Sequence, residues 1–438
     1  MDRKLRVLLL VTEPWRHDDG GGNTLNNFFE GMDAEFAQVY SSEKMPINTV
    51  CERYFQITDV EAVKSFLTKK PVGRVLSKED IHSLENGSNA ENVKRKKTPF
   101  ALVKRLRWET FLFLKEFAWL HCNWKTERLK NFILDFNPDV IYAPCYASPY
   151  SLALTRWVKD LTGKKVVTWS ADDTYSLRQF RFSPIYWMKR FWTRKHLRKT
   201  YPYYDAFYSI SEDEAEEMRD VVGQEIKILR KTVPDDLDYK ERMPHTPIRM
   251  IYAGGIYLNR WKVLAKIGQA LKNINKNGVK CVLDIYTQNE LSKKQKKLLN
   301  DGENIFVHKA VTTEELQKMY TESDIALHVE SFSRKNRLET RLSFSTKIID
   351  CLASGCAVMA IAWEEQTGLK YLKKNDAAIC ITNQNKIEEK LNAIFEQPSI
   401  VSEYALKAYN LSIKNHKKGI VQNELYETLL ANAKKDKL

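Results

Sequence analysis

Length, composition and charge restrict this chain to a few classes of protein. With 438 residues, of which 43% are hydrophobic, 29% are charged and only 16 are Gly, it is long enough for two or three folded domains and is neither disordered nor fibrous. The 70 Lys and Arg residues against 56 Asp and Glu give a formal charge of +14, which indicates an anionic partner.

Other simple patterns indicate a cytosolic protein. The seven Cys residues have no regular spacing and predict free thiols in a reducing compartment. No CxxC or HExxH motif occurs, so we expect neither a structural metal nor a cofactor. The apolar run Val7–Val11 is too short for a signal peptide and is interpreted as a first strand. No run approaches 18 apolar residues, so we expect no membrane-spanning segment.

The first half of the chain alternates short apolar runs with helical patterns, which is typical of a parallel sheet built from strand–helix–strand units. In chain order we predict strand 5–11, helix 24–32, strand 140–143, helix 151–162, strand 166–169, strand 206–210 and helix 212–221. Ser211 is the predicted N-cap of the last helix, because Glu214 follows three residues later. These elements predict one doubly wound domain.

A second series follows the turn-rich stretch Pro234–Pro247. We predict strands 249–253, 282–287, 305–308, 325–329 and 357–361, and helices 262–276, 292–300, 313–323, 345–352, 386–395 and 402–437. The predicted division is an N-terminal Rossmann-like domain over 1–240 with an insertion at about 45–130, a second Rossmann-like domain over 241–405, and a C-terminal helical segment over 406–438 that packs back on the first domain.

Two stretches contain the excess positive charge. Asn92–Lys130 has 11 basic and 3 acidic residues, and Arg178–Lys199 has 8 basic and no acidic ones, so each carries +8. Aromatic residues alternate with this charge, as in helices that lie on anionic membranes. An ordinary helix with an apolar core face and a basic outer face is the alternative for 111–120. Membrane contact is predicted for Lys104, Arg105, Trp108, Trp187, Lys189, Arg190 and Trp192. We expect no nucleic-acid partner, since no recognisable nucleic-acid-binding motif occurs.

Two segments have the residue types of an anion site. Gly20–Gly22 lie between the first strand and the first predicted helix, where free backbone N–H groups favour a phosphate, although the spacing is not GxGxxG. In the second half, Ser345, Thr346 and Lys347 open a predicted helix, where hydroxyls, N–H groups and an ammonium suit a diphosphate. Asp350 lies one turn further along and is placed to bind a ribose diol.

Four segments of the sequence resemble a known protein family. The segment TKIIDCLASGCAVMAI at 346–361, together with NPDVIYAP at 137–144, IYAGGIYLNRWK at 251–262 and VTTEELQKMYTESDIALHV at 311–329, resembles the GT-B glycosyltransferases, specifically the retaining family 4 group. The resemblance implies an α/β fold of two Rossmann-like domains facing a cleft, with a C-terminal helix crossing back to the N-terminal domain. It also implies transfer of a sugar from a nucleotide-sugar donor, without a metal.

The resemblance assigns roles by position. Asp350 stands where the family has a ribose-binding glutamate, and Lys347 with the Ser345 and Thr346 amides would bind the donor phosphates. The remaining donor-binding residues that it implies are Arg260, Lys262, Gly21 and Gly22. The family's first glutamate would fall at 342, where this chain has Leu342. Glu330 is therefore the predicted sugar-contacting catalytic residue, with the extra loop Ser331–Arg341 in between.

Asp172 and Asp173 follow the predicted strand 166–169 and therefore lie at the carboxyl edge of the sheet. One of them is predicted to orient the acceptor hydroxyl, and helix capping is the alternative role. The expected function is transfer of a hexosyl group from a UDP-sugar to a lipid-linked or cell-envelope polysaccharide acceptor at the inner face of the membrane. The alternatives are a nucleotide-sugar epimerase of the same fold and a non-catalytic protein that binds a nucleotide sugar or a glycan.

Overall fold

The computed structural model describes residues 3–17, 20–48, 50–51, 53–77, 80 and 109–434. The chain divides into two compact units. Unit 1 comprises residues 1–177, 181–229 and 422–438, and unit 2 comprises residues 178–180 and 230–421. The predicted domain limits at 240 and 405 stay a prediction.

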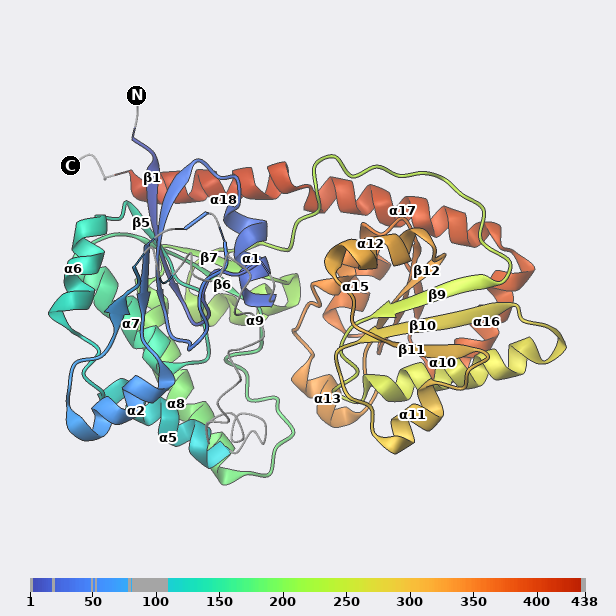
Figure 1. The fold of residues 1–438 in the computed structure, drawn as a ribbon, viewed down its shortest axis with the longest axis horizontal. Coiled ribbons are helices and arrows are strands. Elements are labelled where there is room, and N and C mark those ends of the chain that lie inside the picture. Colours follow the sequence, from blue (N-terminus) through green and yellow to red (C-terminus); the bar gives the residue numbers. More distant parts are fainter. Residues whose placement is uncertain are drawn as a thin grey trace. The chain divides into compact units, whose positions relative to one another are not determined.

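Unit 1 is built on a mostly parallel sheet of eight strands in the order β4-β3-β2-β1-β5-β6-β7-β8 (Figure 1). Its strands are β1 (Leu5–Val11), β2 (Ala34–Tyr40), β3 (Arg53–Gln56), β4 (Arg74–Val75), β5 (Val140–Tyr142), β6 (Val166–Ser170), β7 (Ala206–Ser209) and β8 (Ile226–Ile228). Only the β3–β4 pair is antiparallel among the described strands of this sheet. Six of the seven residues of β1 are buried, as expected for a central parallel strand covered on both faces.

The helices of unit 1 complete its core of buried side chains. They are α1 (Gly20–Phe29), α2 (Asp59–Thr68), α5 (Glu109–His121), α6 (Glu127–Phe136), α7 (Pro149–Thr162), α8 (Pro184–Thr200) and α9 (Glu212–Val222). The Ser211 hydroxyl accepts a hydrogen bond from the Glu214 amide, so the predicted cap of α9 is confirmed. Helix α1 begins at Gly20, four residues before the predicted start, and the three glycines therefore form its first turn.

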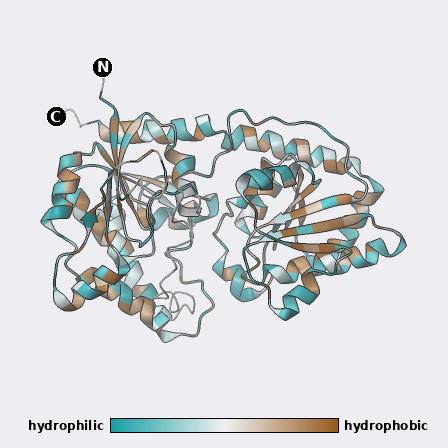
Figure 2. Cartoon of the chain, viewed as in Figure 1, coloured by the Kyte–Doolittle hydropathy of each residue, from teal (hydrophilic) through white to brown (hydrophobic). Residues whose placement is uncertain are grey.

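Unit 2 has a parallel sheet of six strands in the order β11-β10-β9-β12-β13-β14. The strands are β9 (Ile248–Ala253), β10 (Cys281–Thr287), β11 (Ile305–Lys309), β12 (Ile325–Val329), β13 (Ala357–Ile361) and β14 (Ile379–Ile381). The helices are α10 (Arg260–Ile274), α11 (Lys293–Leu299), α12 (Thr313–Thr321), α13 (Arg334–Glu339), α14 (Lys347–Leu352), α15 (Thr367–Lys374), α16 (Ile387–Glu396) and α17 (Ser399–His416). Apolar residues concentrate on the strands between the two helical layers (Figure 2).

The predicted helix 402–437 is two helices, α17 and α18 (Lys418–Ala433). They are interrupted at Lys417, whose neighbours His416 and Lys418 form backbone hydrogen bonds with Val233. From residue 422 onward the chain belongs to unit 1, where Leu425 and Leu429 are fully buried. The Tyr208 hydroxyl of β7 donates to the Thr428 hydroxyl at 2.7 Å, so the C-terminal helix packs on the N-terminal region as predicted.

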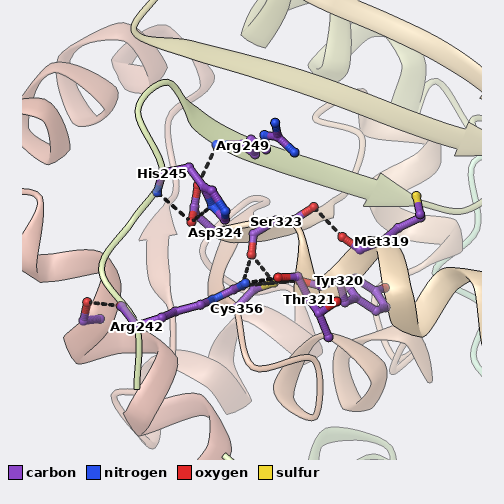
Figure 3. Close-up of polar contacts among 10 residues, drawn as sticks. Arg242, His245, Arg249, Met319, Tyr320, Thr321, Ser323, Asp324 and Cys356 are labelled. Atoms are coloured by element: carbon purple, nitrogen blue, oxygen red, sulfur yellow. Dashed lines mark hydrogen bonds and ion pairs between the residues drawn. The ribbon is translucent and has the colours of Figure 1, made fainter. Parts of the chain in front are cut away.

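The Pro-rich stretch before β9 is attached to the amino edge of the sheet in unit 2 (Figure 3). The Arg242 guanidinium donates to the backbone carbonyls of Thr321 and Ser323 at the end of α12. Asp324 is buried and accepts hydrogen bonds from the His245 and Arg249 amides at 3.1 and 2.8 Å. This attachment fixes the position at which β9 enters the sheet. No helix within the described residues is long and apolar enough to cross a membrane.

Candidate functional site

The strand order of unit 2 brings two separate chain segments together at one point of the sheet edge. The sheet grows in opposite directions from β9 and β12, which pair with each other. In an open parallel sheet, ligands bind at the carboxyl ends of the strands where this order reverses. Residues 254–259 follow β9 and Glu330 follows β12, so both lie at that switch point.

The loop 254–259 has a backbone that places α10 close to this edge. Leu258 and Asn259 adopt left-handed conformations with φ of 54° and 61°, which is uncommon for residues with side chains. A Cβ atom on Gly254 would overlap the Lys347 ammonium. The Asn289 side chain accepts a hydrogen bond from the Ile256 amide at 2.8 Å. As a result Arg260 is the first residue of α10 and stands at the end of the sheet.

Arg260 and Glu330 form the central pair of the site. The guanidinium donates to both carboxylate oxygens, at 2.6 and 3.1 Å, and the two side chains are only 12% and 3% exposed. Burial raises the pKa of Glu330, and Arg260 and Lys347 oppose that rise. A bidentate pair of this kind is geometrically specific, and each partner would be costly to bury alone.

Lys347 adds a further positive charge beside this pair. It is the first residue of α14, and the part of the chain that the structure describes offers its ammonium no hydrogen bond or ion pair. Burial and the nearby Arg260 lower the pKa of Lys347. Buried His328 on β12 stays neutral, because burial and the two cations lower its pKa to about 3. Because Glu330 pairs with Arg260, the Lys347 ammonium is the positive charge of this cluster that an anion could bind.

Asp350 lies on α14 and forms an ion pair with Lys231 at 2.5 Å. The predicted helix opening at Ser345–Lys347 is close to the observed start at Lys347, and no side chain caps it. Lys262 does not join the cluster, because it is exposed and its ammonium lies 5.7 Å from the centre of the Trp261 ring. Of the predicted basic pair, only Arg260 is at the sheet edge.

A cavity also lies along the same edge of the sheet in unit 2. A cavity of about 800 Å³ lies at the carboxyl ends of β10 and β11, where Thr287, Asn289, His308 and Lys309 contribute to its lining. It shares Asn289 with the network that holds the loop 254–259. Its volume is in the range of cavities that bind small organic molecules.

The candidates in unit 1 have different surroundings. Gly21 and Gly22 lie in the first turn of α1, not in a loop before it, so their backbone N–H groups belong to a helix N-terminus. Asp172 is exposed. The Asp173 side chain is only 3% exposed, accepts a hydrogen bond from the Ser176 amide at 2.8 Å and pairs with Arg190 at 2.9 Å. Asp173 thus fixes a turn and a helix, and does not cap a helix itself.

The residues predicted to contact a membrane divide into three groups. Lys104, Arg105 and Trp108 lie outside the described residues. Trp187 and Trp192 on α8 are partly buried, and Trp192 packs on Phe113 of α5 with ring centres 5.2 Å apart. Lys189 and Arg190 face groups of their own unit, since burial and Glu116 act on Lys189 and Arg190 pairs with Asp173. Membrane contact through Arg190 does not fit this placement.

Sequence reasoning did not select four residues of the site. Lys231 is separated from its partner Asp350 by 119 positions. Gly254 and Gly255 directly follow a strand, as Gly20–Gly22 follow the first predicted strand at a short distance. The same pattern of glycines after a strand could therefore have indicated them as site residues. His328 lies within an apolar strand, and nothing local distinguishes it from a core residue.

The comparisons with known proteins agree with this architecture. The sequence of residues 269–419 matches the family described as "Glycosyl transferase-like". The matched segment comprises 151 of the 438 residues, about a third of the chain. It contains Glu330, Lys347 and Asp350, whereas Arg260 and Lys231 precede it. No curated protein matches the sequence.

Solved structures resemble the whole chain. HepE from Anabaena, in complex with UDP and glucose, has a TM-score of 0.58 at 10% identity, over 98% of this chain and 100% of that one. The E. coli trehalose-6-phosphate protein bound with UDP-2-fluoro glucose has a TM-score of 0.57 at 10% identity, over 97% and 98%. The GtfA/B complex has a TM-score of 0.50 at 15% identity, and the match covers 71% of this chain but only 61% of that one. The chain has the GT-B fold.

Proposed function

We propose that this chain is a retaining, metal-independent glycosyltransferase. It would move a hexosyl group from a UDP-sugar to a lipid-linked or cell-envelope glycan at the cytosolic face of the membrane. The observation that carries the proposal is the Lys347 ammonium beside the Arg260–Glu330 pair at the switch point of unit 2. This ammonium has no hydrogen bond or ion pair to any residue that the structure describes. A diphosphate is the anion that such a site fits, and the glycosyl transferase-like sequence includes two of these residues.

The site residues have distinct roles in this proposal. Lys347 and Arg260 neutralise the diphosphate, and Glu330 holds the guanidinium in position. Asp350 is placed for the ribose hydroxyls, for which it would exchange its contact with Lys231. The cavity at the ends of β10 and β11 is large enough for the nucleoside.

The reaction needs charge stabilisation more than a protein nucleophile. The bond between the anomeric carbon and the diphosphate oxygen breaks while the acceptor oxygen bonds to that carbon from the same face. The acceptor proton passes to the leaving diphosphate, whose developing charge is stabilised by Lys347 and Arg260. Groups fixed in advance around a developing charge lower the barrier, because they need not reorganise during the reaction.

The test is an incubation of the full chain with UDP-, GDP- and dTDP-sugars and a bacterial lipid extract, followed by mass spectrometry of the lipids and detection of free nucleoside diphosphate. We expect one donor to produce a sugar-shifted lipid. The variant Lys347→Met should lower the rate roughly 100-fold, the cost of removing one charge-stabilising group. The control Lys373→Met removes an exposed lysine of α15, with 57% of its side chain accessible, and should change nothing.

Other results would assign the chain differently. An isomerised nucleotide sugar without a new glycoside would replace the transferase by an epimerase. Binding of a nucleotide sugar without any turnover would indicate a binding protein. Equal rates for Lys347→Met and Lys373→Met would show that the cluster in unit 2 is not the donor site.

A further inference from the structure

The carboxylate of Asp350 already has a cationic partner from a distant part of the chain. The Lys231 ammonium lies 2.5 Å from Asp350 Oδ1, and the two side chains are 20% and 34% exposed. Among the residues that the structure describes, Lys231 is the only one that forms a hydrogen bond or ion pair with this carboxylate. Both residues belong to unit 2. A ligand that needs the Asp350 carboxylate therefore has to share it with a cation or displace that cation.

The main chain on both sides of Lys231 is fixed beside α14. Arg230 is only 7% exposed, and its guanidinium carbon lies 4.6 Å from the centre of the Phe344 ring and 4.5 Å from that of Tyr371. Cation–π contacts of this kind are favourable when they are shielded from water. Val233 is held by backbone hydrogen bonds to the break between α17 and α18. The flexible side chain of Lys231 can thus leave Asp350, but its backbone stays close enough for it to return.

A ribose diol and the Lys231 ammonium compete for the same oxygen. Two neighbouring hydroxyls can donate to both oxygens of one carboxylate, because an ionised carboxylate only accepts hydrogen bonds. Lys231 occupies Oδ1 of Asp350, so binding of the diol to both oxygens requires a charge-assisted contact to break. A 2′-deoxyribose has a single hydroxyl on this part of the ring. It can donate to Oδ2 and leave the ion pair in place.

We propose that Lys231 is a specificity-determining residue that competes with the nucleotide ribose for Asp350. The competition weakens binding of ribonucleotides more than binding of 2′-deoxyribonucleotides. It also favours release of the nucleoside diphosphate after the reaction, because Lys231 re-forms its pair with Asp350 as the product leaves. The inference rests on the proposed function, since it takes the ribose of the donor as the ligand of Asp350.

The positive charge of Lys231 has a second effect, which the experiment must separate from the first. An ammonium in this unit attracts the diphosphate of any nucleotide, and removal of the charge weakens that attraction. The attraction is the same for a ribonucleotide and for its 2′-deoxy counterpart. The ratio of their dissociation constants therefore reports only on the contact between the ribose and Asp350.

The test measures this ratio by calorimetric titration of the full chain with UDP and 2′-deoxy-UDP, and with GDP and 2′-deoxy-GDP, without an acceptor. In Lys231→Met we expect the preference for the ribonucleotide to rise roughly 5-fold, the effect of one partly exposed ion pair that no longer has to break. Lys231→Gln should change the ratio in the same direction. Lys240→Met removes an exposed lysine of the same unit and should leave the ratio unchanged.

A double-mutant cycle shows whether Lys231 acts through Asp350. Asp350→Asn should lower the preference for the ribonucleotide, because the amide accepts through only one oxygen. Lys231→Met should then have no further effect on the ratio in the Asp350→Asn background, since the competition has lost its object. Melting temperatures of the variants identify any loss of folding.

The inference and the proposed function can fail separately. An unchanged ratio in folded Lys231→Met and Lys231→Gln overturns the competition, and so does a lower ratio, because Lys231 would then hold Asp350 in position for the ribose. Either result together with sugar transfer leaves the proposed function in place. A higher ratio in a chain that transfers no sugar contradicts the glycosyltransferase proposal and keeps the competition. A chain that binds no nucleoside diphosphate contradicts both.

Discussion

At the scale of single residues, the position of the Lys347 ammonium in the candidate donor site depends on a glycine, Gly254. Gly254 has room for Lys347 only because it lacks a side chain. We expect Gly254→Ala to displace the ammonium and to weaken binding of UDP roughly 10-fold, measured by calorimetry. The double variant Gly254→Ala with Lys347→Met should bind no more weakly than Lys347→Met alone, because both changes remove the same contact. Additive losses would mean that Gly254 acts through something other than Lys347.

A buried carboxyl in unit 1 makes stability depend on pH. Glu214 is fully buried and accepts hydrogen bonds from the Ser170 and Ser209 hydroxyls, both at 2.6 Å, and burial raises its pKa from 4.5 to about 7. The folded state then binds a proton that the unfolded state releases, so the contribution of Glu214 to stability is fully present below pH 4.5 and is lost as the pH rises through about 7. The full loss is roughly 3 kcal/mol.

Urea unfolding at several pH values between 5 and 8 tests this dependence. Glu214→Gln should flatten the curve, because its side chain does not titrate, and the variant should gain in relative stability above pH 7. Glu216→Gln, an exposed residue of the same helix, should leave the slope unchanged. Parallel curves for the unmodified chain and Glu214→Gln would show that Glu214 is not the titrating group.

At the scale of elements, the Arg242 side chain is one of the groups that hold the segment before β9 (Figure 3). Arg242 donates to carbonyls at the carboxyl end of α12, where the helix dipole also favours a cation. Arg242→Met leaves those carbonyls without a charged donor and should lower the free energy of unfolding by about 1–3 kcal/mol. Arg249→Met, at an exposed position seven residues later, should cost much less in the same urea titration. Equal losses of unfolding free energy in Arg242→Met and Arg249→Met would show that Arg242 contributes no more than an exposed arginine.

At the scale of the whole molecule, the chain returns to unit 1 through α18. Leu429 is fully buried there, whereas Leu406 on α17 is 44% exposed. Leu429→Ala should therefore cost about 2–5 kcal/mol, the range for a large core side chain, and Leu406→Ala very little. Hydrogen exchange measured by mass spectrometry should show faster exchange in β7, which α18 contacts through Tyr208. Unchanged protection of β7 would mean that α18 adds nothing to unit 1.

Local patterns predicted those elements whose sequence is unambiguous. The strands at 5–11, 325–329 and 357–361 have the predicted limits, because continuous apolar runs are typical of buried parallel strands. The start of α1 was wrong, since three glycines favour a loop and only the surrounding structure makes them helical. The strand Ala34–Tyr40 was missed, because an acidic and an amide residue interrupt its apolar run.

The sequence by itself determined the α/β class, the resemblance to GT-B glycosyltransferases and the lysine that opens α14. These features depend on residues that are close together in the sequence, so hydrophobic periodicity and helix-capping patterns are enough to predict them. Only the tertiary structure decided which residues meet. Arg260 joins Glu330 across 70 positions, because strand order places their segments at the same sheet edge. Lys231 joins Asp350 across 119 positions. Contacts of that kind follow from the crossovers between strands, and no local pattern contains them.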